Sequence, residues 1–439
     1  MRKFRDVCLC CSWLVCVSAC SDGGASEPAD AAAPGQSPID ALARDGGAGT
    51  QSLLDGAVLD GGAAVPRGIA VVHSDYQSSS VSLLDRDGNL VKDGCFNSGT
   101  GGPGLSMTLT GDVALPSQIA SGSTVPIVDR GNATLTWLDA ATCAPLRQMS
   151  VGTGFAANPH DYVELAPDKA YVPRYQPNGS ATPAANDFDD GNDLLIIDPG
   201  KGTIVGRIDL VPFAPAGVLP RADRALLIDG KVYVSLNAAD AKFSKYSIGR
   251  IVMVDPSTDQ VVASIDIPGA KNCGAMTYLA GEKKLLVACG GDYGAGAAQA
   301  ASSAIVTLDM SVSPPVVTAT LTAASLGAQP FSNSTVAALD GVTSLAVATG
   351  DFSNVPPDAL WLLGPGGVPS SKAFQSSEAF SLGAVLVDTE RGRVFVTDGT
   401  TQTPASVRVF ASAAGTLQQV AEVKTNPTQK LPPRGLAWF

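Results

Sequence analysis

The chain of 439 residues has a formal net charge of −12, is rich in glycine (47) and proline (30), and contains only 16% charged residues. An acidic surface repels phosphate backbones, so these values argue against nucleic-acid binding. Short apolar runs between turn-forming residues predict many strands, and no long amphipathic helical pattern follows residue 60.

The first 19 residues are predicted to be an export signal. Basic residues at the start precede an apolar run from Val7 to Val17, which is too short for a membrane span of ~20 residues. The sequence VSAC at 17–20 resembles the bacterial lipobox, which implies that Cys20 is acylated. An ordinary secretory signal is the alternative. We therefore expect an extracytoplasmic cell-envelope protein, held at the outer membrane or cell surface by a lipid on Cys20.

Residues 20–65 consist mainly of Ala, Gly, Asp, Ser and Pro. Such a segment has too little apolar surface to form a core, so we expect a disordered tether. The folded domain is then predicted to cover residues 66–439.

Four cysteines follow the leader, and an even number in an exported protein favours disulfides. Cys273 and Cys289 flank two strand-like runs that are symmetric about residue 281, so a hairpin would place them side by side. Pairing of Cys95 with Cys143 follows by elimination. Metal binding by these thiols is the alternative, although no CxxC spacing occurs.

Seven similar segments follow one another between residues 81 and 423. Each contains an alternating apolar strand, a turn and a second apolar strand, and the turn positions recur every 47 to 59 residues. Most of these hairpins are preceded by a second strand pair, so each unit is predicted to hold four antiparallel strands. That composition is typical of a β-propeller blade.

The two ends of the domain are predicted to complete the same blade. The first unit begins at residues 67–72 without an inner strand, and residues 433–439 form an isolated strand-like run. Pairing the two would close the ring and remove exposed sheet edges. The sequence therefore predicts an all-β, seven-bladed β-propeller closed by the C-terminal strand in the first blade.

Three segments carry a resemblance to a known family: NPHDYVELAPDKAYV, DPSTDQVVASIDIPG and VLVDTERGRVFVTDG. They resemble the YVTN-type repeats of bacterial surface propellers, which are similar to the lactonase-like propellers that include 6-phosphogluconolactonases. The matching positions are structural, because the Asp residues of LLIIDP and IVMVDP are expected to cap turns. The resemblance thus implies the fold, and a site must be argued separately.

Ligand-binding residues are expected where the first strand of each blade begins and the second ends, around the mouth of the central channel. This face is predicted to carry both carboxylates and guanidinium groups. The candidates are His73, Asp75, Asp129, Arg130, Asp161, Asp223, Asn237, Asp292, Asp351, Asp398 and Arg434.

His160 is the leading candidate for chemistry, because the chain has only two histidines and imidazole is the usual acid or base near neutral pH. In a lactonase, His160 would relay a proton while Arg174 or Arg221 stabilised the oxyanion. The alternative is that His160 only hydrogen-bonds neighbouring strands at the mouth.

Asp187, Asp189 and Asp193 offer several oxygen donors within seven residues, which is the type of ligand that calcium prefers. The segment lacks the spacing and distal Glu of an EF-hand. A solvated acidic loop is therefore the alternative to a calcium site.

Two functions remain open from the sequence. The preferred one is a non-catalytic binding or scaffold lipoprotein whose ligand is a protein, a glycan or a small molecule, since the GxSxG, HExxH and Walker motifs are missing. The alternative is a hydrolase of lactones or related esters that acts at the channel mouth.

Overall fold

The computed structural model describes residues 67–120, 124–179, 188–327, 329–350, 356–401, 405–413, 415–425 and 429–439. All of them belong to one compact unit, Leu59–Phe439. The predicted signal peptide (1–19), the tether (20–65) and Cys20 lie outside the described residues. No helix within the described ranges is long and apolar enough to cross a membrane.

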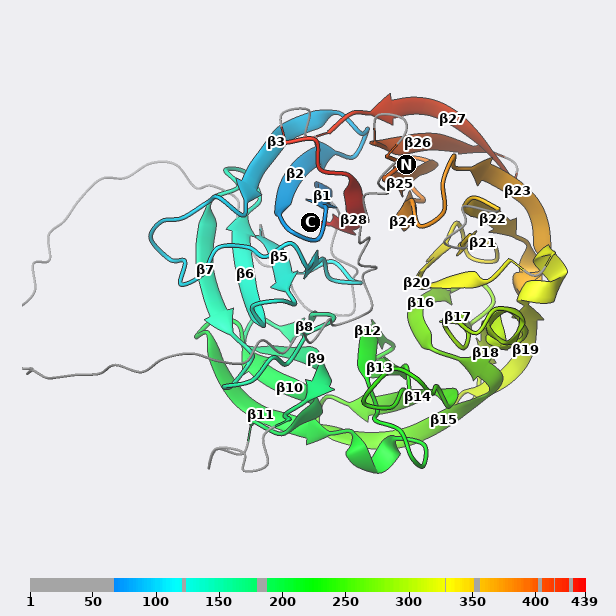
Figure 1. The fold of residues 1–439 in the computed structure, drawn as a ribbon, viewed down its shortest axis with the longest axis horizontal. Coiled ribbons are helices and arrows are strands. Elements are labelled where there is room, and N and C mark those ends of the chain that lie inside the picture. Colours follow the sequence, from blue (N-terminus) through cyan, green and yellow to red (C-terminus); the bar gives the residue numbers. More distant parts are fainter. Residues whose placement is uncertain are drawn as a thin grey trace, which may run out of the picture. The chain divides into compact units, whose positions relative to one another are not determined.

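Seven four-stranded antiparallel sheets are arranged as the blades of a propeller (Figure 1), which confirms the predicted fold. From the inner to the outer strand, blade 1 contains β28 (Pro433–Trp438), β1 (Gly68–Ser74), β2 (Ser79–Asp85) and β3 (Leu90–Asn97). Blades 2 and 3 contain β4 (Val113–Ala114), β5 (Thr124–Asp129), β6 (Thr134–Asp139) and β7 (Pro145–Ser150), then β8 (Val163–Ala166), β9 (Lys169–Pro177), β10 (Gly191–Asp198) and β11 (Thr203–Asp209).

The remaining blades repeat this order. Blades 4 and 5 contain β12 (Ala222–Ile228), β13 (Lys231–Leu236), β14 (Ile248–Asp255) and β15 (Gln260–Lys271), then β16 (Cys273–Leu279), β17 (Lys284–Gly290), β18 (Ser303–Asp309) and β19 (Val316–Thr322). Blades 6 and 7 contain β20 (Phe331–Ala338), β21 (Ser344–Ala348), β22 (Ala359–Leu363) and β23 (Pro369–Gln375), then β24 (Leu382–Asp388), β25 (Arg393–Asp398), β26 (Ser406–Ala413) and β27 (Thr416–Val423). The described helices are short: α1 (Ala297–Ser302) and the 3-10 turns Val211–Phe213, Ala323–Leu326 and Pro365–Gly367.

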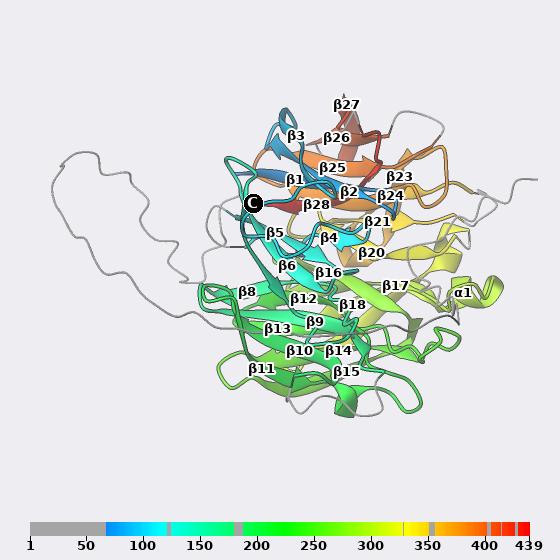
Figure 2. The ribbon, with the colours of Figure 1, turned by 60° about the vertical axis from the view of Figure 1, so that its left-hand side comes forward.

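The C-terminal strand closes the ring as predicted. β28 pairs antiparallel with β1, with Ile69 opposite Trp438 and Val72 opposite Gly435. Figures 1 and 2 both show β28 beside β1 in blade 1. Blade 1 therefore joins the first and last described segments of the chain, and the inner edge of β1 is covered by a partner strand.

The hydrophobic core consists of seven clusters, one in each interface between neighbouring blades. Strand β1 illustrates the division, because successive side chains of a strand point to opposite faces. Ile69 and Val71 pack with residues of blade 7, such as Phe395, whereas Ala70 and Val72 pack with residues of blade 2. The strands are apolar on both faces because each blade is covered on both sides.

Several inner strands begin with a β-bulge. Ala222 and Ala225 of β12 are three positions apart, but the residues they pair with in β13 are only two positions apart, so β12 contains one extra residue. The same shift occurs at the start of β16 and β24. In β24 the hydroxyl of Thr397 fills the bulge, since it accepts the backbone N–H groups of Gly383 (3.1 Å) and Ala384 (2.8 Å). The bulges fix the backbone at the end of the ring where the candidate residues lie.

The repeated aspartates cap turns, as the resemblance implied. Asp198 accepts the backbone N–H of Lys201 at 2.9 Å, and Asp255 accepts that of Ser257 at 3.0 Å. Hydrogen bonds from the Ser257 hydroxyl and Lys231 lower the pKa of Asp255 to about 2. These repeated aspartates thus serve the fold.

Both predicted disulfides are present. Cys273 and Cys289 are paired residues on β16 and β17, and Cys95 of β3 is bonded to Cys143 in the turn after β6. The second bond joins blade 1 to blade 2. All four thiols are thus used in disulfides, which rules out the alternative of a thiolate metal site.

Candidate functional site

The antiparallel register gathers many of the predicted residues at one end of the ring. Each inner strand begins there and the next strand ends there: Pro159 bridges Arg174, Ala222 pairs with Leu236, and Pro433 pairs with His73. We call this end the mouth.

An aromatic stack joins blades 3 and 4 at the mouth. The ring of His160 stacks on Tyr175 of β9, with centroids 4.1 Å apart and planes inclined by 7°. Tyr175 is nearly parallel to Phe243, and the guanidinium carbon of Arg221 lies 5.3 Å and 4.3 Å from these two rings. His160 is only 3% exposed and Arg221 1%. The stack therefore packs like a protein interior.

A buried carboxylate holds the imidazole. Nδ1 of His160 lies 2.8 Å from Oδ1 of Asp223, whose Oδ2 accepts the side-chain amide of Asn237 at 3.2 Å. Burial lowers the pKa of His160, outweighing the attraction of Asp223. A neutral imidazole that donates its Nδ1 proton to Asp223 is the state that this arrangement favours.

The two candidate arginines are also bonded within the protein. Nε and Nη2 of Arg174 donate to the two oxygens of Asp193 at 2.7 and 2.6 Å, and Nη1 donates to the hydroxyl of Thr153 at 2.8 Å. Both Arg174 and Asp193 are completely buried. Arg221 donates to the side chain of Gln176 and to the carbonyl of Asp240. Both guanidinium groups are thus buried and held by contacts within the protein.

Three of the predicted carboxylates tie segments of the mouth together. Asp161 accepts the backbone N–H groups of Ser117 (2.8 Å) and Ala225 (3.0 Å). Asp129 accepts the N–H and hydroxyl of Thr110. Asp398 accepts the hydroxyl of Ser376 and the guanidinium of Arg408. Because these bonds join different blades or strands, the carboxylates already have a structural use.

The remaining predicted residues have various surroundings. His73 is buried beside Ser82, Asp75 caps its own turn, Arg130 pairs with Asp112, and Asp292 pairs with Lys271. Arg434 donates to the carbonyl of Phe380 at 3.0 Å and lies over the ring of Tyr76. Asp351 lies outside the described residues.

The structure does not bring the predicted calcium ligands together within its described part. Asp187 lies outside that part, Asp193 is bonded to Arg174, and the backbone carbonyl of Asp189 accepts the side-chain amide of Asn178. Among the described residues, no group of three or more His, Cys, Asp or Glu side chains is arranged to hold a metal ion.

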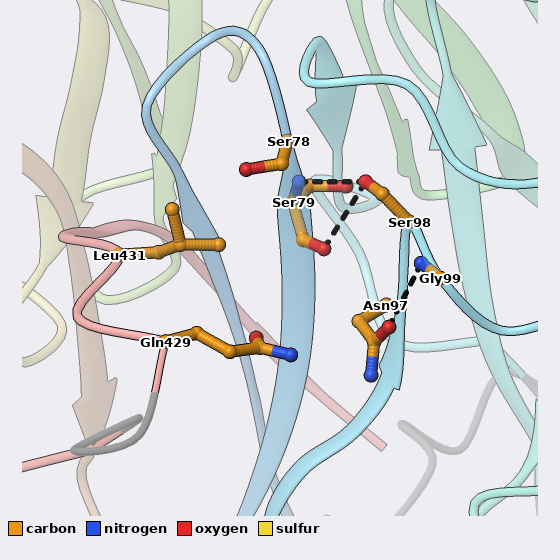
Figure 3. Close-up of a pocket in the computed structure, with 7 residues that line it drawn as sticks. All are labelled: Ser78, Ser79, Asn97, Ser98, Gly99, Gln429 and Leu431. Atoms are coloured by element: carbon orange, nitrogen blue, oxygen red, sulfur yellow. Dashed lines mark hydrogen bonds between the residues drawn. The ribbon is translucent and has the colours of Figure 1, made fainter.

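A pocket of about 180 Å³ lies away from the aromatic stack, in blade 1. Its walls come from β2, from the end of β3 and from the segment before β28 (Figure 3). We call it the seam pocket, because it lies in the blade that combines the first and last strands of the domain. It is lined by Ser78, Ser79, Asn97, Ser98, Gly99, Gln429 and Leu431.

Sequence reasoning did not find several of the contacts between blades. Gln118 follows β4 of blade 2, yet its amide accepts the N–H of Leu227 (2.6 Å) and donates to the carbonyl of the same residue (3.0 Å) in blade 4. Phe243 lies in a long loop, and no local pattern links it to Tyr175. The run of serines at 78–80 was the one visible sign of the seam pocket.

No protein-family model matches this sequence, and no curated protein is significantly similar to it. Solved structures do share its fold. A putative 6-phosphogluconolactonase from Bacteroides uniformis has a TM-score of 0.56 and 12% identity, covering 85% of this chain and 100% of its own. One from Bacteroides fragilis has a TM-score of 0.54 and 10% identity, covering 88% and 100%. At these identities the similarity concerns the fold.

Proposed function

We propose that this protein is a lipoprotein of the bacterial cell envelope, anchored through Cys20, whose propeller is a non-catalytic binding or scaffold domain. The sequence supports the anchor, through the short apolar leader and the lipobox-like VSAC at 17–20. A long tether after Cys20 would hold the domain away from the membrane.

One observation carries the non-catalytic part of the proposal. The side chains best suited to acid–base or oxyanion chemistry, His160, Arg174 and Arg221, are at most 3% exposed and bond to groups of the protein. A catalytic acid or base must reach the substrate within hydrogen-bond distance. These residues join strands and blades, so their contacts stabilise the propeller itself.

The competing hypothesis is a lactone hydrolase, and it is tested directly. The purified full-length protein is incubated with a panel of sugar lactones and simple aryl esters, and ring opening is followed by pH-stat titration. We expect no hydrolysis above the rate in buffer. Turnover that is lost in His160→Gln, in a variant that still folds, would refute the proposal and favour the hydrolase.

The anchor is tested in bacterial cells supplied with radiolabelled palmitate. We expect label in the wild-type protein and none in Cys20→Ser, which should also move from the membrane fraction to the soluble fraction. Cys16→Ser, within the leader, serves as the matched control and should keep the label. An unlabelled wild-type protein would contradict the lipid anchor.

A further inference from the structure

The outer strand of each blade leaves an open sheet edge at the rim of the propeller. Within the described residues, an outer strand has only one partner strand, so the N–H and C=O groups on its other side are not paired in the sheet. Figure 1 shows these strands around the rim, with β19 as the outer strand of blade 5. An open edge is a template for a further strand, and proteins protect it with charged side chains, short strands and bulges. The seven edges can therefore be compared by their protection.

Among the seven described outer strands, β19 is the one without a charged residue. All seven contain a bulge near their start, and in β19 the extra residue is Thr318. The position two residues after the bulge is Thr320 in β19, whereas it is charged in blades 1, 3, 6 and 7. The outer strands of blades 2 and 4 have a charge close to this position. These charged residues are Asp93, Arg207, Lys372 and Glu422, and then Arg147 and Asp266.

The sequence around β19 is neutral over a much longer stretch. Residues 293–339 contain a single charged residue, Asp309, although 16% of the whole chain is charged. This stretch includes α1, β18, β19, the 3-10 turn that follows β19, and β20. Val312, in the turn before β19, is 46% exposed, and Val316, at the start of β19, is 48% exposed. The rim of blade 5 is thus neutral and partly apolar on a protein whose formal charge is −12.

This distribution of charge favours a second copy of the chain as the partner of the edge. Two acidic copies repel each other over most of their surface, but at the β19 edge neither copy contributes a charge. The regular part of the edge after the bulge, Ala319–Thr322, also matches itself. If two copies run antiparallel about Thr320, this threonine lies opposite its own counterpart and Ala319 lies opposite Leu321 of the second copy. Threonine pairs and apolar pairs of this kind stabilise antiparallel strands.

We propose that two copies of this protein associate through their β19 edges, so that blade 5 of one copy and blade 5 of the other form one continuous antiparallel sheet. A two-fold axis beside Thr320 relates the copies, which is the commonest symmetry of homodimers. The contact involves one strand and its adjoining turns, so it is smaller than the ~1,200 Å² of a typical stable interface, and we expect a weak dimer with a Kd on the order of 10 µM. The rim lies apart from the mouth, so this inference depends neither on a ligand nor on the lipid anchor.

Sedimentation velocity of the purified full-length protein, in detergent with micelles in large excess, measures the association over a concentration series. Thr320→Lys places like charges opposite each other across the two-fold axis. Ser264→Lys is the matched control, because Ser264 is exposed at the same position of β15, two residues after the bulge. We expect Thr320→Lys to raise the Kd at least about tenfold and Ser264→Lys to change it less than about twofold. A wild-type protein that stays monomeric at ~100 µM, or equal effects of the two variants, would overturn the proposal.

A second pair of variants tests the register in bacterial cells. Opposite Cβ atoms of an antiparallel pair lie about 4.5–5.5 Å apart, close enough for Thr320→Cys to form a disulfide between two copies when diamide takes up the two protons and two electrons of the thiols. The four cysteines of the domain are already bonded to one another. We expect a covalent dimer on non-reducing gels for Thr320→Cys and none for Ser264→Cys. Equal crosslinking in both variants, or a Thr320→Cys variant that couples only to a different protein, would overturn the pairing of two copies.

Discussion

At the scale of single residues, the mouth shows how chemical type can suggest catalysis where burial points to structure. His160 and Asp223 form the kind of pair that activates nucleophiles, yet the imidazole is sealed between strands and stacked on Tyr175. Arg174 likewise forms a two-point ion pair inside the protein. A sequence can reveal that a histidine and an arginine lie near the channel, but the exposure of their polar atoms depends on neighbouring blades.

The Arg174–Asp193 pair can be tested by removing one partner. Arg174→Met would leave the buried carboxylate of Asp193 without its two-point partner, so we expect a loss of about 3–5 kcal/mol in the free energy of unfolding. Urea denaturation, monitored by tryptophan fluorescence, measures this free energy. Lys201→Met removes a pair whose lysine side chain is 77% exposed, and should leave the urea midpoint close to that of the wild-type protein. Similar losses in both variants would contradict the argument.

His73 predicts how stability depends on pH. Burial, opposed by the charge of Asp93, lowers its pKa from 6.5 to about 4. Between these values the unfolded chain binds the proton and the folded chain does not, so stability is retained above pH 6.5 and falls as the pH drops toward 4. The loss should reach up to about 3 kcal/mol.

Urea midpoints measured at pH 7, 5.5 and 4.5 test this expectation. His73→Gln should flatten the decline without abolishing it, because burial lowers the pKa of His160 as well. Midpoints of the wild-type protein that stay constant across this range would show that His73 titrates normally.

At the scale of elements, the short apolar runs were sufficient to predict most strands, because strands buried on both faces have nearly continuous apolar sequence. The inner strand of blade 2 was not predicted, since β4 contains only Val113 and Ala114. The bulges of the inner strands were not predicted from the sequence either. They depend on a side chain from the adjacent strand, such as Thr397, and leave no period in the sequence.

The bulge of β24 leaves no room for a side chain. A Cβ on Gly383 would lie 2.4 Å from the carbonyl oxygen of Arg434, which belongs to the backbone of β28. Gly383→Ala should therefore destabilise the fold by about 1–3 kcal/mol. The control is Gly364→Ala, where the nearest atom would be 3.8 Å away. Thermal unfolding compares the two, and an unchanged midpoint for Gly383→Ala would contradict the close contact.

At the scale of the whole molecule, the repeat spacing and the isolated C-terminal run allowed the number of blades and the closure to be predicted. The clusters between blades, the link from Gln118 to Leu227 and the seam pocket could not be predicted in this way. Each of them joins residues of different blades or of distant segments. Such contacts depend on how the blades pack, which a repeat pattern does not specify.

Closure by β28 should be essential for folding. A chain that ends at Pro432 would expose the inner edge of β1 and remove Ala437 and Phe439 from the core between blades 1 and 2. We expect aggregation during size-exclusion chromatography and a broadened thermal transition. A synthetic peptide of residues 429–439 should restore a monomer by filling the gap. A truncated chain that stays monomeric with the wild-type melting temperature would contradict this role.

Arg67 lies at one end of blade 1, so a segment that precedes it must join the blade at that end. Its N–H donates to the carbonyl of Phe439, and β1 then runs from Gly68 to Ser74, which pairs with Ser79 beside the seam pocket. The attachment point and the pocket are thus separated by the full length of a strand. A load applied through a membrane anchor would therefore reach blade 1 at the end opposite the mouth, where Pro433 pairs with His73.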